Sequence, residues 1–172
     1  AFAVQIDSEG SMSPGSFEVT LDLGWNMVSV PVWPCDPSRD VVFPGVAAVF
    51  TWDPVNKRYM RPATIDPRFA YWVLLSGVEP RTIEVIGTPA LEWDIDEISQ
   101  GWNMIGSGYG DDARGLECLT TTADPDPLQR NSIFYWDPVN KRYARATGIA
   151  QGVGHWLASG DSCDLALRQP GA

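Results

Sequence analysis

The sequence predicts an all-β protein made of two tandem pseudo-symmetric repeats of about five strands each, arranged as a sandwich or a barrel. Three observations support this prediction. Sixteen glycines and fourteen prolines are spread along the 172 residues, which leaves little room for long helices. Short segments alternate apolar and polar side chains, and the second half of the chain repeats motifs of the first half in the same order.

The clearest repeat is an octet that occurs twice without change. Residues 52–59 and 136–143 both read Trp-Asp-Pro-Val-Asn-Lys-Arg-Tyr, an offset of 84 residues. The Gly-Trp-Asn of residues 24–26 returns at 101–103, an offset of 77, so the second copy has seven extra residues between these two motifs. We therefore divide the chain into an N-terminal arm and two β repeats, with these bounds: 1–16, 17–90 and 91–172.

Each copy opens with a strand that has one apolar and one polar face. The apolar positions run from Phe17 to Leu23 in the first copy and from Leu91 to Ile95 in the second. Such alternation is typical of antiparallel sheets with one face on a core and one in water. Further strands are expected at these ranges: 25–30, 49–52, 57–60, 71–75, 82–86, 155–158 and 164–168. A helical turn is expected at 36–40, capped by Asp36.

The octet predicts a β-hairpin because each turn position has a suitable residue. Pro54 presets φ, Asp53 accepts hydrogen bonds from the following backbone, and Asn56 tolerates a left-handed conformation. If Asp53 and Asn56 close the turn, the following residues lie opposite one another: Trp52 and Lys57, Phe50 and Tyr59, and in the second copy Phe134 and Tyr143.

Composition and charge exclude several classes of protein. The net charge of −10 repels a phosphate backbone, so we expect no nucleic-acid partner. No run of residues approaches the ~20 apolar residues of a membrane span, so we expect no membrane insertion. The opening Ala1-Phe2-Ala3 is typical of a processed chain, which favours secretion.

The motif order resembles the GWN modules of large secreted and cell-surface proteins of bacteria and archaea. The first copy carries the pattern at residues 24–31, Gly-Trp-Asn-Met-Val-Ser-Val-Pro, followed by the Trp-Asp element and an aromatic-Trp-Val strand. The second copy departs from it at residues 106–108 and at His155. The resemblance covers residues 17–168. It implies an extracellular or cell-surface setting, a role in adhesion, display or assembly, and no catalytic residues.

The eight tryptophans suggest carbohydrate binding, since exposed rings stack on sugar faces. Six of them form three matched pairs, which we interpret as the buried framework of the two cores: Trp25 and Trp102, Trp52 and Trp136, Trp72 and Trp156. Trp33 lies outside the repeat, between two prolines, and is expected to be exposed. A polysaccharide site would therefore use Trp33 and the hairpin tips.

The basic residues of the octet are not required by the turn. Lys57 and Arg58 return as Lys141 and Arg142, which indicates either a shared partner contact or a recent duplication. Tyr109 opens the segment 109–130, where the copies differ most. We expect function to lie in such variable loops.

Other groups have weaker chemical patterns. Four acidic residues in the variable segment are a candidate calcium site, and no other cofactor is expected: Asp111, Asp112, Asp124 and Asp126. A disulfide between Cys118 and Cys163 is expected, with Cys35 to Cys118 as the rival pairing. The arm alternates apolar and polar residues, and three apolar side chains in it are candidates for pairing with a neighbouring subunit: Phe2, Val4 and Ile6.

A catalytic function is less favoured by the sequence. His155 stands where the first copy has Tyr71, which indicates a packing role. Asp94 and Asp96 share the polar face of a strand with Glu92, which is typical of a solvated surface. We therefore expect a non-catalytic interaction or assembly module of a surface or filament-forming protein, bound to another protein or to a second copy. A carbohydrate-binding module is the alternative, and a small hydrolase using acidic residues is a remote one.

Overall fold

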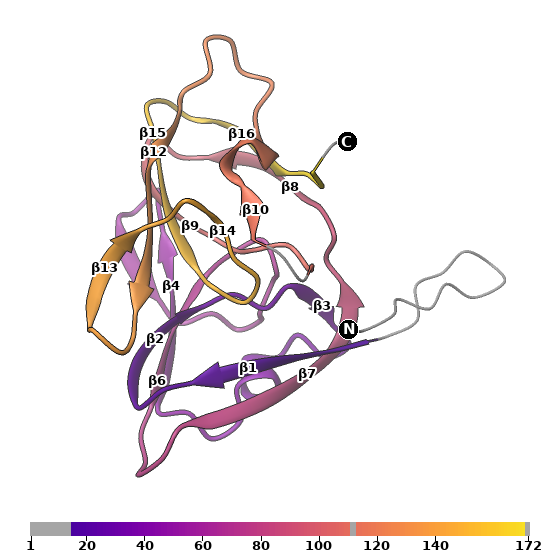
Figure 1. The fold of residues 1–172 in the computed structure, drawn as a ribbon, viewed down its shortest axis with the longest axis vertical. Helices are drawn as coiled ribbons and strands as arrows, with labels where there is room; N and C mark the ends of the chain where they lie inside the picture. Colours follow the sequence, from indigo (N-terminus) through magenta and orange to yellow (C-terminus); the bar gives the residue numbers. More distant parts are fainter. Residues whose placement is uncertain (1–14, 111–112, 171–172) are drawn as a thin grey trace, which may run out of the picture.

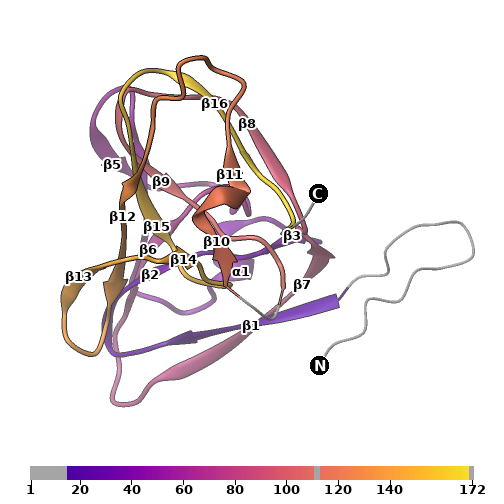
Figure 2. The same cartoon turned by 45° about the horizontal axis from the view of Figure 1, so that its top comes forward.

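The computed structural model describes residues 15–110 and 113–170, and it confirms the predicted all-β class (Figures 1 and 2). The strands of the first copy are β1 (Gly15–Leu21), β2 (Gly24–Val28), β3 (Val32–Pro34), β4 (Ala48–Asp53), β5 (Arg58–Met60), β6 (Tyr71–Leu75) and β7 (Arg81–Pro89). Those of the second copy are β8 (Trp93–Ile98), β9 (Gly101–Ile105), β10 (Arg114–Gly115), β11 (Leu119–Thr120), β12 (Leu128–Asp137), β13 (Arg142–Arg145), β14 (Gly148–Ile149), β15 (His155–Ser159) and β16 (Cys163–Leu167). The arm residues Phe2, Val4 and Ile6 lie outside the described part of the chain.

Two short helical segments lie between the strands. The α-helix α1 (Arg39–Val42) follows β3, and the 3-10 helix η1 (Leu116–Cys118) precedes β11. The helix therefore begins three residues and ends two residues later than the predicted turn at 36–40, because Ser38 occupies the N-cap position while the Asp36 carboxylate accepts the Ser38 N–H at 2.9 Å. No helix within the two described ranges has the length and hydropathy needed to cross a membrane.

Each copy contributes one four-stranded and one three-stranded antiparallel sheet. The strand orders are β2-β6-β4-β5 and β1-β7-β3 in the first copy, and β9-β15-β12-β13 and β8-β16-β11 in the second. The strands β10 and β14 form a separate pair. Strands that correspond in sequence, such as β4 and β12, therefore hold the same place in their sheets.

The two sheets of each copy enclose a buried apolar core. Val19 of β1 and Val73 of β6 belong to the core of the first copy, and Leu165 of β16 and Leu157 of β15 to that of the second. Full burial of side chains of this size stabilises the fold by about 1.5–3 kcal/mol each. The predicted alternation along the first strand of each copy supplies one wall of each core.

The Gly-Trp-Asn motif forms the turn between the two sheets. Gly24 has a φ of 91°, which a residue with a side chain rarely adopts. The side chain of Asn26 accepts the N–H of Asp22 at 2.9 Å and donates to its carbonyl at 2.8 Å. Asn103 makes the same pair of bonds with Ser99. The tryptophan between glycine and asparagine is left outside this ring of hydrogen bonds.

The copies contact each other through matched backbone hydrogen bonds. The Ser29 N–H donates to the Gly152 carbonyl at 2.9 Å, and the N–H of its counterpart Gly106 donates to the Arg68 carbonyl at 2.8 Å. The Ser107 N–H donates to the buried Ser29 hydroxyl at 2.8 Å. These bonds join the residues that follow β2 and β9 to the segments that precede β15 and β6 of the opposite copy, so the ends of β2 and β9 lie close to that copy.

The predicted hairpin register is wrong by two positions. The observed opposite pairs are Trp52 and Tyr59, Asp53 and Arg58, Trp136 and Tyr143, and Phe134 and Arg145. A shift of two positions leaves every side chain on its predicted face. The aromatic residues of each hairpin therefore still share one face, but they face different partners from those expected.

The cause of the shift lies in the turn. The Asp53 carboxylate accepts the N–H groups of Val55 and Asn56 at 3.1 and 3.0 Å and the Asn56 side-chain amide at 2.7 Å. Asn56 is thereby held inside the turn, and Lys57 takes the left-handed conformation with a φ of 50°. Lys141 does the same with a φ of 51°. The turn is longer than predicted because the exit residue is the lysine.

Neither predicted disulfide forms. All three cysteines carry free thiols, Cys35 being exposed and the other two buried. The Arg168 N–H donates to the Cys118 carbonyl, so Cys118 lies beside the end of β16, whereas Cys163 lies at its beginning. The five residue steps from Cys163 to Arg168 span about 16 Å of strand, well beyond the roughly 7 Å limit for bridged Cα atoms.

Candidate binding site formed by two aromatic grooves

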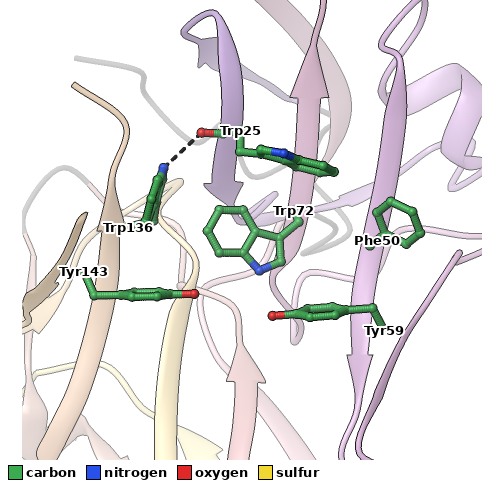
Figure 3. Close-up of a pocket in the computed structure, with 6 residues that line it drawn as sticks. All are labelled: Trp25, Phe50, Tyr59, Trp72, Trp136 and Tyr143. Atoms are coloured by element: carbon green, nitrogen blue, oxygen red, sulfur yellow. Dashed lines mark hydrogen bonds between the residues drawn. The ribbon is translucent and has the colours of Figure 1, made fainter. Parts of the chain in front are cut away.

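Six aromatic side chains line a groove between the copies, which we name groove 1 (Figure 3). Its volume is about 430 Å³ and its lining is Trp25, Phe50, Tyr59, Trp72, Trp136 and Tyr143. The first four come from β2, β4, β5 and β6 of the first copy, and the last two from β12 and β13 of the second. In Figure 3 the hydroxyls of Tyr59 and Tyr143 point toward each other beside Trp72.

A second groove, groove 2, has the corresponding lining. Its volume is about 550 Å³ and its residues are Trp52, Tyr59, Trp102, Phe134, Tyr143 and Trp156. Replacing each residue of groove 1 by its counterpart in the other copy gives this set. Tyr59 and Tyr143 belong to both grooves, so the two grooves meet at these tyrosines.

Each hairpin supplies rings to both grooves, because alternate residues of a pleated strand point to the same face and lie at different places along it. Phe50 and Trp52 lie two residues apart on one face of β4, and Tyr59 lies opposite Trp52. Phe50 lines groove 1, Trp52 lines groove 2, and Tyr59 lines both. The rings of each octet therefore contribute to grooves that both copies form, and the pattern of a single strand does not predict this.

Reciprocal hydrogen bonds hold the crossing rings in place. The Trp52 indole N–H donates to the Trp102 carbonyl at 2.9 Å, and the Trp136 indole N–H donates to the Trp25 carbonyl at 3.0 Å, as Figure 3 shows. Trp72 meets Trp136 edge to face, with ring centroids 5.4 Å apart and planes at 72°. Rings at such angles form a corrugated groove and no flat platform.

The expectation that all six paired tryptophans are buried framework is met fully only by Trp72. It is wrong for Trp25 and Trp102, which are exposed, and it holds only in part for three that are partly buried: Trp52, Trp136 and Trp156. Trp72 is 9% exposed, but Trp25 and Trp102 are 41% and 46% exposed, as exposed as Trp33 at 40%. Tyr59 and Tyr143 are about half exposed. The reason is that the turn of the Gly-Trp-Asn motif directs these two rings onto the groove rather than into a core. Open aromatic surface of this extent is typical of a binding face.

Basic residues border the aromatic face. The two segments 48–61 and 132–145 contain six basic and two acidic residues, a net charge of +4 in a chain of net charge −10. The Arg61 guanidinium lies 5.5 Å from the centre of the Phe50 ring, and its counterpart Arg145 lies opposite Phe134. Arg61 thus lies beside the phenylalanine of groove 1, whereas the Arg145 guanidinium donates a hydrogen bond to the Asn131 side-chain oxygen at 3.0 Å.

The predicted octet candidates lie on the same two hairpins but do not line the grooves. Arg58 is exposed and its Nε lies 3.7 Å from the Asp53 carboxylate. Lys57 and Lys141 form the turn exits, and Arg142 begins β13. These residues add positive charge around the grooves, which sequence reasoning located without identifying the aromatic surface beside them.

Trp33 and Tyr109 lie apart from the groove linings. Trp33 is in the edge strand β3, and its ring lies 5.7 Å from the Arg68 guanidinium. Tyr109 packs against the core of the first copy, and its carbonyl accepts a hydrogen bond from the buried Arg114 at 2.9 Å. Tyr109 therefore has a structural contact, while Trp33 remains an exposed ring.

The acidic candidates do not converge. Asp111 and Asp112 lie outside the described residues. The Asp126 carboxylate accepts the Leu128 N–H at 2.9 Å and pairs with Arg130 at 2.6 Å, which holds the pKa of Asp126 below its usual value against the effect of burial. Asp124 is exposed nearby. Over residues 15–110 and 113–170 no group of three or more His, Cys, Asp or Glu side chains could hold a metal ion.

The strand carboxylates that were considered for catalysis have structural contacts. Asp94 forms an ion pair with Arg168, and the Glu92 carboxylate accepts the Gln169 N–H at 2.9 Å. These bonds attach the end of the chain after β16 to β8. Asp96 is exposed.

His155 is a buried strand residue. It is 1% exposed in β15 between Tyr135 and Ile105, and its Nδ1 has no hydrogen-bond partner among the described residues. Burial lowers the pKa of His155 to about 4, although a hydrogen bond with the Val153 backbone acts in the opposite direction. The imidazole is therefore neutral near pH 7, in agreement with the packing role that its position predicts.

Comparison of the chain with protein families, with curated proteins and with solved structures gave no match.

Proposed function

We propose that the protein is a non-catalytic binding module that holds a partner along grooves 1 and 2. The observation that carries this proposal is the identity of residue type at all five groove pairs. The pairs are Trp25 and Trp102, Phe50 and Phe134, Trp52 and Trp136, Tyr59 and Tyr143, and Trp72 and Trp156.

Packing alone does not account for this identity. Framework positions differ between the copies, as at Tyr71 and His155 or Val30 and Ser107, although all four of these residues are buried. A recent duplication would have left such positions alike as well. Exposed rings contribute less to stability than buried ones, so retention of Trp25 and Trp102 is better explained by a ligand.

The resemblance to GWN modules favours an extracellular or cell-surface setting for this binding. A protein partner is the leading choice, since tryptophan, tyrosine and arginine are the side chains that dominate protein interfaces. Two equivalent grooves also allow bivalent binding, which raises avidity when the partner carries repeated segments.

Carbohydrate binding is the second candidate because exposed tryptophan and tyrosine rings can stack on sugars. The sequence alone predicts such a site at Trp33 and the hairpin tips, and the rings of the grooves are a second possible location. The two locations are separable by substitution.

The test probes a glycan array and an array of extended peptides with three proteins: the wild type, the double variant Trp25→Ala/Trp102→Ala, and Trp33→Ala. We expect ligands that bind the wild type and Trp33→Ala and lose at least about tenfold in affinity with the double variant. Circular dichroism and thermal unfolding verify that each variant is folded. Ligands lost only with Trp33→Ala, or no groove-dependent ligand on either array, would contradict the proposal.

A further inference from the structure

The hydrogen-bonding groups of the grooves restrict which ligand fits, if the proposed binding function holds. The lining residues offer indole N–H and phenolic O–H donors, and their only side-chain acceptors are the two tyrosine oxygens. The indole N–H groups of Trp52 and Trp136 are already bonded to backbone carbonyls. Burial raises the pKa of Tyr59, and nearby Tyr143 adds to this effect, so the Tyr59 hydroxyl retains its proton.

A ligand with many donors is disfavoured by this inventory. Each buried sugar hydroxyl or ordinary backbone N–H needs an acceptor, and leaving one unsatisfied costs about 1–3 kcal/mol. Proline has no backbone N–H, so a proline-rich segment presents its carbonyl acceptors with few backbone donors. Such a segment adopts an extended helix with apolar rings on its surface, and grooves lined by aromatic side chains are a recurrent way to bind it.

The charges around the grooves indicate the sign of the charge that the ligand carries. Arg61 lies beside the phenylalanine of groove 1, and Arg145 is the cross-strand neighbour of the phenylalanine of groove 2 and donates to Asn131 at 3.0 Å. The two hairpins have a net charge of +4. Opposite charge steers the association of a ligand and opposes partners of like charge. For the same reason, two copies of this protein pack poorly through this face, since each would present the same positive border.

We infer that grooves 1 and 2 bind acidic, proline-rich extended segments of a partner protein. The prolines occupy the spaces between the rings, the tyrosine and exposed indole donors bind carbonyls, and Arg61 and Arg145 bind flanking carboxylates. Each lining residue of groove 1 has a counterpart of the same type in groove 2, so a segment finds the same set of contacts in either groove. Two short segments therefore bind per chain, and a long repeated segment gains avidity.

The test measures fluorescence anisotropy of labelled synthetic peptides of about twelve residues, long enough to span about 37 Å as a polyproline helix. The probe consists of Pro-Pro-Asp triplets. The comparison peptides consist of Pro-Pro-Lys triplets, Pro-Pro-Ser triplets and glutamate alone, and oligogalacturonate serves as an anionic sugar. We expect the acidic proline-rich peptide to bind at least about tenfold more tightly than each of the others, and more weakly as salt is raised.

Variants of the full chain then locate the contact. Trp25→Ala/Trp102→Ala and Arg61→Glu/Arg145→Glu should each weaken binding by about tenfold or more. Arg61→Lys/Arg145→Lys keeps the charge and should retain most of the affinity. The controls Ile86→Ala and Arg39→Glu change an exposed apolar and a basic side chain away from the grooves, and should leave binding unchanged.

Several results overturn the inference, and they separate it from the proposed function. Equal binding of the neutral or basic proline peptides removes the acidic requirement. Tight binding of the glutamate peptide removes the need for proline. Tryptophan-dependent binding of oligogalacturonate without peptide binding refutes the ligand class and leaves the binding face itself intact. If no probe binds, the ligand class is wrong, and the arrays decide separately whether the grooves bind anything.

Discussion

The buried imidazole of His155 predicts a specific loss of stability in mild acid. In the folded protein burial lowers its pKa from 6.5 to about 4, whereas in the unfolded chain it titrates near 6.5. Between these values the unfolded state binds a proton that the folded state excludes. The contribution of neutral His155 to the free energy of unfolding is therefore fully present above about pH 6.5. It decreases as the pH falls toward 4, and below that pH His155 causes no further loss.

The magnitude follows from the size of the shift. One pKa unit corresponds to about 1.4 kcal/mol, so the full shift gives a loss of about 3 kcal/mol in the free energy of unfolding. The range from pH 4 to 6.5 is suited to measuring the effect of His155, because the chain has no other histidine. The carboxylates with perturbed pKa values, such as Asp53, Asp137 and Asp164, have them lowered from 3.8, so their effect on stability begins at lower pH.

The assay is urea unfolding followed by tryptophan fluorescence at intervals from pH 4 to 7.5. His155→Tyr is the matched comparison, because the first copy has Tyr71 at this position, with its hydroxyl accepting the Asp66 N–H at 2.8 Å. The variant should lose the slope between pH 4 and 6.5 while the wild type shows it. Parallel profiles for the two proteins, or a His155 pKa near 6.5 in a nuclear magnetic resonance titration, would refute the reasoning.

Three further predictions concern the turns, the contact between the copies and the thiols. Lys57→Gly and Lys141→Gly should each raise the free energy of unfolding by about 1 kcal/mol, since glycine adopts a positive φ without the steric cost that lysine has, and a lowered stability would contradict the assigned turn. Ser29→Ala should lower it by about 1–3 kcal/mol in the same unfolding assay, because the buried Ser107 N–H loses its acceptor, and no change would mean that water or another group replaces the hydroxyl. A thiol reagent should modify only Cys35 in the folded protein and all three cysteines after unfolding, and addition of a reductant should leave the melting temperature unchanged; a drop in that temperature would indicate a disulfide.

Local chemistry explains why much of the fold could be predicted. The alternation from Phe17 onward, the octet turn and the Gly-Trp-Asn turn depend on residues close in sequence, and they gave the main strands to within a few residues. The short strands β10, β11 and β14 were missed because two residues are too few to show a period. The strand β3 was missed because it follows Pro31 and ends at Pro34, and an edge strand tolerates such prolines.

The grooves could not be predicted in the same way because their rings come from both copies. Trp136 meets Trp25 and Trp72 only after the second hairpin crosses to the first copy. The alternation identified which rings share a face, but not whether that face is buried in a core or open to a ligand. One signal was available in the sequence, since Tyr59 and Tyr143 return with the tryptophans although a hairpin turn does not require a tyrosine at that position.

The places where the copies differ show what their contact demands. Where two equivalent residues approach each other, equal side chains compete for one space. Gly154 is the counterpart of Ala70, and a Cβ added to it would lie 2.7 Å from the Ala70 Cβ. Gly106 is the counterpart of Ser29, and its added Cβ would lie 1.9 Å from the Pro67 carbonyl oxygen.

Distances this short require one copy to have the smaller residue. The two copies therefore differ in sequence at the positions where they are in close contact. The groove rings do not compete in this way, because the contacts between the copies pair non-equivalent rings, such as Trp72 with Trp136 and Trp156 with Trp52. The contact between the copies therefore does not explain why all five pairs are alike, and this identity supports the ligand that we propose for the two grooves.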